Sequence, residues 1–162
     1  MLTRHQRAAL LRKGAKNLVQ GRVSFSPEPT EAQYRFLVFV LAHHGPETTA
    51  FRPLPMPVDF VLGPLLSNAP PEAVERGVLG LFGSGSPLLR VEEVDAAGKL
   101  LKRGSWAMMP LLSSLEYTPG AAHLVGCMND ALLAYLPQLL GLLPPELLEG
   151  LPLAHRPQRL AA

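Results

Sequence analysis

The residues of this chain whose type and position best suit a binding reaction are basic. Six of them fall within the first 22 residues, where no acidic residue occurs, although the net charge of the whole sequence is only +2. Lysine and arginine that displace counterions from nucleic-acid phosphates gain free energy from the counterions released. The predicted DNA contacts in this segment are Arg7, Arg12, Lys13, Lys16 and Arg22. The alternative interpretation is a solvated amphipathic helix.

A second basic group lies further along the chain. Arg76 falls on the polar face of a helix expected over residues 72–82, and Lys99, Lys102 and Arg103 stand at or after an expected hairpin turn. These four residues are predicted to contact DNA phosphates. Arg76 could instead pair with Glu72 on its own helix, and lysines beside a turn often protect a sheet edge. The helix is poor in Asn, Gln and Lys, which favours positioning contacts over base readout.

Motifs for catalysis or metal binding find little support. Residues 83–86, Gly-Ser-Gly-Ser, lack the Lys-Ser/Thr of a phosphate-binding P-loop and indicate a turn. His43 and His44 are adjacent and would diverge on a helix, so no metal site is predicted. Cys127 ends an apolar run and is expected to be a buried small hydrophobe. We therefore expect no enzyme activity, no metal and no cofactor, with a spatially assembled enzyme site as the least favoured alternative.

The elements that position these residues begin with helices. Apolar residues at helical spacing predict an amphipathic helix over residues 4–19. Thr30 and Gln33 fit a capping box, which starts a nearly all-apolar helix over residues 31–44 that should cross the core. Prolines make residues 51–57 an extended edge segment, after which Asp59 is expected to cap a short helix over residues 60–66.

From Leu88 onward the hydrophobic period becomes strand-like. Strands are predicted over residues 88–94, 99–109 and 121–127, joined by turns at 95–98 and 118–120, as one small antiparallel meander. Asn129 or Asp130 should cap a last helix over residues 131–140, bent or restarted at Pro137. The apolar load around Leu112, Leu115 and Tyr117, continued over residues 132–143, is expected to form either a homodimer interface or core.

Length and composition favour one compact domain. The chain has 162 residues, of which 48% are hydrophobic and 17% charged, which argues against disorder. A single cysteine excludes an internal disulfide, and no apolar run matches a signal peptide or membrane span, so a cytoplasmic protein without membrane contact is expected. The predicted organisation is a basic N-terminal helix (1–22), a folded domain (23–143) and a Pro-rich tail or linker (144–162).

The predicted order is a set of helices followed by a hairpin, which is the winged-helix arrangement. The fold class is therefore α+β, a winged helix with four to five helices and a small antiparallel three-stranded sheet. The layout resembles the N-terminal winged-helix domain of Rep-type initiators of iteron-bearing plasmids. The resemblance is carried by Asn17-Leu-Val, Glu31-Ala-Gln-Tyr-Arg-Phe-Leu, residues 51–60, Arg103 to Tyr117, Pro119-Gly120 and Asn129 to Leu136.

The resemblance implies a plasmid replication initiator whose N-terminal domain supplies dimerisation and DNA-backbone contacts at the origin. It also implies double-stranded DNA, a second copy and host replication proteins as partners. After Leu143 the sequence has no room for a second winged helix, so we expect the N-terminal domain alone. The alternative is a winged-helix module for protein–protein contacts without DNA binding, and salt-sensitive duplex affinity separates the two.

Overall fold

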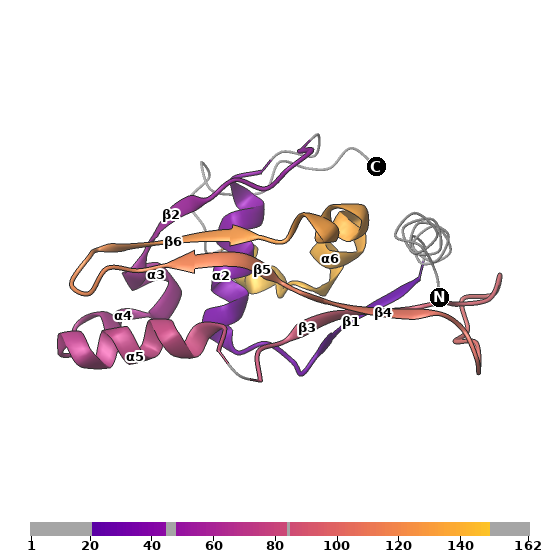
Figure 1. Cartoon of the computed structure of the whole chain (residues 1–162), viewed down its shortest axis with the longest axis horizontal. Helices are drawn as coiled ribbons and strands as arrows, with labels where there is room; N and C mark the ends of the chain where they lie inside the picture. The colour runs from indigo at the N-terminus through magenta and orange to yellow at the C-terminus, as the bar shows by residue number, and fades with distance from the viewer. Residues whose placement is uncertain (1–20, 45–47, 84, 150–162) are drawn as a thin grey trace, which may run out of the picture.

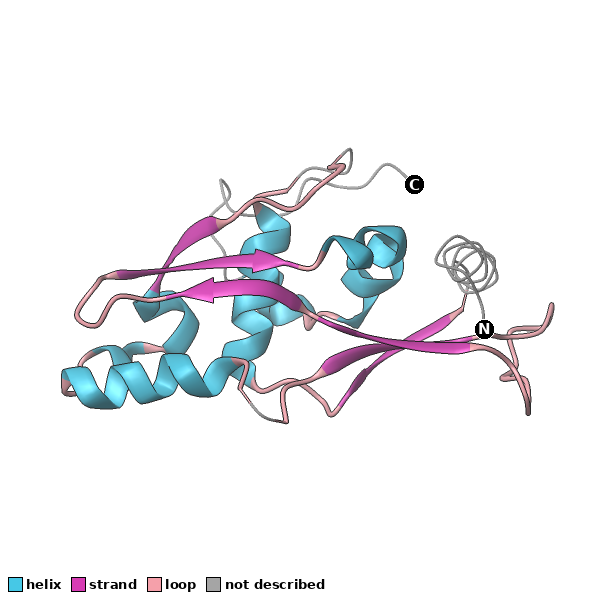
Figure 2. Ribbon diagram, in the orientation of Figure 1, coloured by secondary structure: helices cyan, strands magenta, loops and turns pink. Residues whose placement is uncertain are grey.

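A computed structural model describes residues 21–44, 48–83 and 85–149 of the chain. These residues form an α+β fold with two antiparallel three-stranded sheets (Figure 1 and Figure 2). We call the first the arm sheet; its strand order is β1 (Arg22–Ser26), β3 (Leu88–Glu92), β4 (Trp106–Pro110). The second is the body sheet, in the order β2 (Leu54–Pro57), β6 (His123–Met128), β5 (Leu112–Glu116).

The helices gather around the body sheet, whereas the far end of the arm sheet extends away from them (Figure 2). The central helix is α2 (Glu31–Ala42), and α5 (Pro71–Leu81) lies at the lower edge of the body in Figure 1. The shorter helices are α3 (Val58–Leu62), α4 (Pro64–Ser67), the 3₁₀ helix η1 (Asp130–Tyr135), α6 (Leu136–Leu142) and α7 (Pro145–Glu149).

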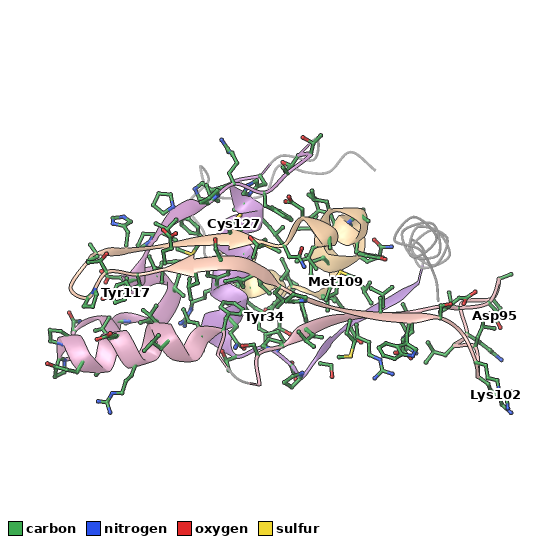
Figure 3. All side chains as sticks on the ribbon, in the orientation of Figure 1. Tyr34, Asp95, Lys102, Met109, Tyr117 and Cys127 are labelled. Atoms are coloured by element: carbon green, nitrogen blue, oxygen red, sulfur yellow. The ribbon has the colours of Figure 1, made fainter. Side chains whose placement is uncertain are left out.

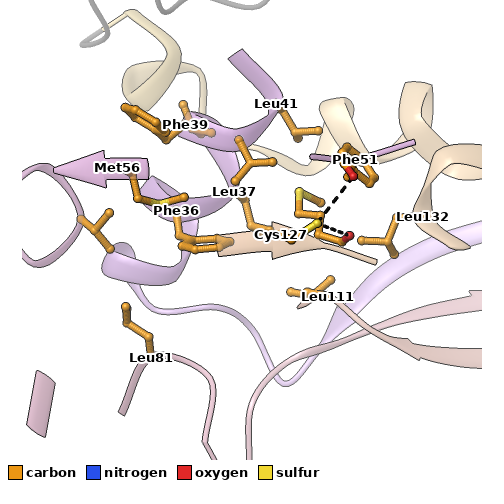
Figure 4. Close-up of a cluster of buried hydrophobic side chains, with 14 of the residues drawn as sticks. Phe36, Leu37, Phe39, Leu41, Phe51, Met56, Leu81, Leu111, Cys127 and Leu132 are labelled. Carbon is orange, nitrogen blue, oxygen red and sulfur yellow. Dashed lines mark hydrogen bonds between the residues drawn. The ribbon is translucent and has the colours of Figure 1, made fainter. Parts of the chain in front are cut away.

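The core forms where α2 crosses the body sheet (Figure 4). The predicted capping box is confirmed, because the Thr30 hydroxyl accepts from the Gln33 backbone and the Gln33 side chain accepts from the Thr30 backbone. Phe36 is fully buried and meets Phe82 edge-on, with ring centroids 4.9 Å apart. A Cβ at Gly126 of β6 would lie 2.4 Å from the Phe36 ring, so only glycine allows this close approach.

One extended stretch of chain, residues 106–116, contributes a strand to each sheet. β4 ends at Pro110 and β5 begins at Leu112, so the buried Leu111 alone separates a strand of the arm from a strand of the body. Asn129 fixes this junction from three sides. Its backbone N–H donates to the Leu111 carbonyl at 2.9 Å, its side-chain amide donates to the Pro110 carbonyl at 3.0 Å, and its Oδ1 caps η1.

The predicted single meander is wrong. β6 pairs with β2 and β5 in the body sheet, not with β4, and residues 112–116 form a strand that the sequence pattern did not indicate. β1 was also missed, and it places Arg22 in a strand instead of the predicted N-terminal helix. Both strands are short and depend on partners distant in sequence, which local periodicity does not report.

Of the remaining predictions for helices and the edge segment, some are confirmed and one is wrong. The expectation for the segment after Asn129 is confirmed, because Asn129 caps the 3₁₀ helix η1 and a new helix, α6, begins at Leu136 with Pro137 in its first turn. The edge position of β2 is also confirmed. Asp59 does not cap a helix, because α3 begins at Val58 and Asp59 lies in its first turn. Within the predicted tail, residues 145–149 form α7, whose Leu147 packs against the core.

Candidate nucleic-acid interface

The arm sheet has a covered face and an exposed face. Val91 and Leu89 of β3 are fully buried on the covered face, which packs towards α6. The strand registers align Arg22, Glu92 and Trp106 in one row across the other face, which we call the outer face of the arm. Trp106, the only tryptophan of the chain, is 63% exposed there.

The next row of the outer face adds a second basic residue. Arg90 lies opposite Met108, which is 41% exposed. The Arg90 guanidinium contacts the Glu92 carboxylate at 3.3 Å, and both side chains keep partial access to solvent. Exposed ion pairs of this kind contribute little to stability, so Arg90 can exchange this carboxylate for a phosphate at small cost. The outer face therefore combines the Trp106 ring on the edge strand β4 with Arg90 and Glu92 on β3 and Arg22 on β1.

The hairpin tip, residues 93–105, begins with the turn that the sequence predicts. The Asp95 carboxylate accepts from the backbone N–H groups of Ala97 and Lys99 at 2.8 and 2.9 Å, and Gly98 adopts φ +81°. This geometry directs the Asp95 carboxylate onto backbone N–H groups of the turn and leaves the Lys99 side chain exposed. The turn therefore presents a cation although it is built on an acid.

Residues 101–104 leave the strand and form a second lobe of the tip, which corrects the continuous strand predicted over residues 99–109. Glu93 holds the base of this lobe, since its carboxylate accepts from the Ser105 N–H at 2.8 Å. Lys102 and Arg103 occupy the exposed turn, and Figure 3 shows Lys102 at the extreme end of the molecule. A Cβ at Gly104 would lie 3.1 Å from that of Glu93, so glycine permits the tight return.

An open hollow joins the tip to the start of β1. Its volume is about 560 Å³, and its lining is Gly21, Arg22, Val94, Gly98, Lys99 and Leu100. Arg22 and Lys99, which are predicted DNA contacts from separate segments, therefore border one depression. The described residues that line it include no acid. A pair of cations at a concave surface is suited to a phosphate group.

The structure does not bring Arg76 to this surface. Arg76 lies on α5, and α5 and the hairpin tip stand at opposite ends of the long axis (Figure 1). Its guanidinium Nε donates to the Glu72 backbone carbonyl at 3.4 Å, so its local partner is the main chain of the preceding turn. Arg7, Arg12, Lys13 and Lys16 lie outside the described residues. Of the predicted contacts, Arg22, Lys99, Lys102 and Arg103 share the arm.

Tyr34 marks the base of the arm (Figure 3). Its ring meets Phe25 of β1 edge-on, with centroids 5.9 Å apart. Burial raises the pKa of the Tyr34 hydroxyl above its usual 10.0, and the nearby Glu28 carboxylate raises this pKa further. Tyr34 therefore stays neutral at physiological pH and acts as a packing residue that attaches β1 to α2.

The other residues singled out for chemistry have structural partners. Cys127 is buried, as predicted, and its thiol donates to the Phe51 carbonyl at 3.6 Å. His44 is also buried, with Nδ1 2.8 Å from the Val40 carbonyl and Nε2 accepting from the Arg52 N–H at 3.1 Å. Within the described residues, no three His, Cys, Asp or Glu side chains are grouped to hold a metal ion.

Most of the apolar residues between Leu111 and Leu143 that suggested a homodimer interface lie in the core or pack against it. The buried members are Leu111, Leu132, Tyr135, Leu136, Leu139 and Leu143. The exposed large apolar residues lie mainly on the arm instead: Leu100, Leu101, Trp106 and Met108. The alternation of Trp106, Met108 and Pro110 along β4 was the signal that could have indicated this exposed face.

None of the helices in the described part of the chain combines the length and apolar character needed to cross a bilayer. No family model, no curated protein and no solved structure matches this chain.

Proposed function

We propose that the chain binds nucleic acid through the arm. The observation that carries the proposal is the exposed Trp106 ring on a face that also holds Arg22 and Arg90, with Lys99, Lys102 and Arg103 beyond it at the tip and the facing Glu92 paired to Arg90. Aromatic rings stack on bases while lysine and arginine contact the backbone, a combination found at nucleic-acid surfaces. The neighbouring acids Glu93 and Asp95 are held by backbone N–H groups, which reduces their repulsion of phosphate.

Fluorescence of the single tryptophan gives a direct test. Duplex and single-stranded oligonucleotides are titrated into the full chain at two salt concentrations, and quenching of Trp106 is followed. We expect saturable quenching and an affinity that falls as salt rises, because each phosphate contact releases counterions. Absence of binding at low salt would overturn the proposal. Equal affinity at both salt concentrations would also count against phosphate contacts.

Matched charge reversals locate the surface. Arg103→Glu should weaken binding by about tenfold at low salt, because one phosphate contact becomes repulsive. Arg76→Glu makes the same type of change at the opposite end of the molecule and should leave the affinity unchanged. Equal losses in the two proteins would show that the effect follows net charge and not the arm.

We further propose the specific role that the sequence resemblance suggests, which is that of a winged-helix domain of a plasmid replication initiator. Its support is the layout of sequence motifs together with the cationic hairpin. Preference for a duplex bearing repeated origin sequences over a scrambled duplex of equal length tests it. Homodimerisation and contact with host replication proteins belong to the same proposal, and sedimentation of the free chain tests the first.

A further inference from the structure

A groove at the other end of the molecule is independent of the arm. It opens between α5 and β5 and has a volume of about 500 Å³. The wall on the α5 side consists of Glu75, Val78, Leu79, Phe82 and Gly83. The wall on the β5 side consists of Leu112, Ser113, Ser114, Leu115 and Tyr117. Leu79 is 68% exposed, which is the highest exposure among the large apolar side chains of the described residues.

The groove runs beside an unpaired strand edge. β5 is the outer strand of the body sheet and pairs on one side with β6. On its other side Figure 1 shows α5, and no strand of the described chain pairs there. An edge strand presents a row of backbone N–H and C=O groups to which another extended chain can bond. A strand added beside β5 would direct alternate side chains into the groove and onto the outer face of the sheet.

The charges around the groove indicate what such a strand would carry. Glu75 lines the groove itself, and Glu116 is exposed at the end of β5. No basic residue occurs among the described residues that line the groove. Apolar side chains would match the wall formed by Leu79, Phe82 and Leu115. Lysine or arginine at the intervening positions would point to the outer face of the sheet, on the side of Glu116.

We propose that this groove binds an extended segment of a partner protein in which apolar and basic residues alternate. The segment adds to the free edge of β5 as a fourth strand and inserts its apolar side chains between β5 and α5. A second copy of the chain fits less well, because β5 contributes an acid and no base to such a pairing. The groove therefore provides a peptide-binding surface separate from the proposed nucleic-acid surface.

Fluorescence anisotropy of a labelled eight-residue peptide that alternates valine and lysine tests the proposal with the full chain. We expect saturable binding, and at least about tenfold weaker binding of the peptide that carries glutamate in place of lysine. Glu116→Gln should reduce this preference, because Glu116 lies on the face of β5 opposite to Leu115, the face to which the peptide lysines point. Equal affinity of the two peptides, or absence of binding by both, would overturn the proposal.

Two leucine variants locate the peptide. Leu79→Gln removes an exposed apolar wall of the groove and should weaken the valine–lysine peptide about tenfold, since burial of one leucine side chain is lost. Leu101→Gln makes the same change at the hairpin tip and should leave the affinity within twofold. If both variants bind as tightly as the original chain, the groove is not the site. A dimer that Leu79→Gln dissociates would show a second copy in the groove and would also overturn the proposal.

Strand addition itself has a separate readout. In two further peptides, alternate backbone amides are N-methylated, so that one peptide loses the N–H groups facing β5 and the other loses those facing solvent. We expect one of them to lose at least about tenfold in affinity and the other to bind nearly as tightly as the unmodified peptide. Equal losses in both would contradict pairing along the β5 edge.

Discussion

The arm sheet and the body sheet are built alike but use their surfaces differently. Each has three antiparallel strands, and one extended stretch through Leu111 contributes to both. The body sheet packs against α2 around Phe36 and Gly126, whereas the arm continues past the helices and leaves Trp106 exposed. Stability should therefore depend on the body and nucleic-acid affinity on the arm, so changes in the two sheets should affect different measurements.

The largest expected effect on stability comes from Phe36→Ala in the body. The fully buried ring contacts Phe82, and its loss should lower the free energy of unfolding by about 3–5 kcal/mol through lost burial and the cavity left behind. Urea denaturation measures this change. Trp106→Ala removes the larger ring from the arm and should change stability by less than about 0.5 kcal/mol. Similar losses in both variants would remove the distinction between the sheets.

Substitution of Gln33 is expected to have the next largest effect on the free energy of unfolding, because Gln33 connects two helices of the body. Its side-chain amide donates to the Leu81 carbonyl at 2.5 Å while its oxygen accepts from Thr30, so it joins the start of α2 to the end of α5. Gln33→Leu leaves the buried Leu81 carbonyl without this donor and should cost about 1–3 kcal/mol. Thermal unfolding measures this change.

Asn129 tests the connection between the two regions. Asn129→Ala removes the cap of η1 and the bond to the Pro110 carbonyl, which should cost about 1–2 kcal/mol. Hydrogen exchange should show faster exchange in β4 and η1 than in α2. Uniform acceleration across all three elements would indicate that the arm and the body unfold as one unit.

The smallest expected effect is a dependence of the free energy of unfolding on pH in the alkaline range. Burial raises the pKa of the Tyr135 hydroxyl above 10.0, so the folded chain holds this proton more tightly than the unfolded chain. The free energy of unfolding should therefore fall as pH rises above about 10 and through the folded-state pKa. Tyr135→Phe should reduce this fall, and Tyr34 should account for part of the remainder. An unchanged pH profile would contradict the assignment to Tyr135.

Local sequence signals predicted the parts of the fold that depend on near neighbours. The Thr30–Gln33 capping box, the Asp95–Gly98 turn and the Asn129 cap each involve residues two to four apart, and each is present. The sheet organisation was not predicted, because pairing of β6 with β2 joins segments far apart in the chain. Residues 101–104 interrupt the strand predicted over residues 99–109, and nothing local in the sequence indicates that Glu93 turns them outward.

For the candidate interface, the sequence by itself determined that cations would occur at the hairpin turn, since Asp95 and Gly98 specify that turn locally. Only the tertiary structure decided which cations lie together. It joined Arg22 to Lys99 by pairing β1 with β3, and it separated Arg76 by placing α5 at the opposite end of the molecule. The physical reason is that backbone turns are set by a few adjacent residues, whereas a shared surface depends on the packing of the whole core.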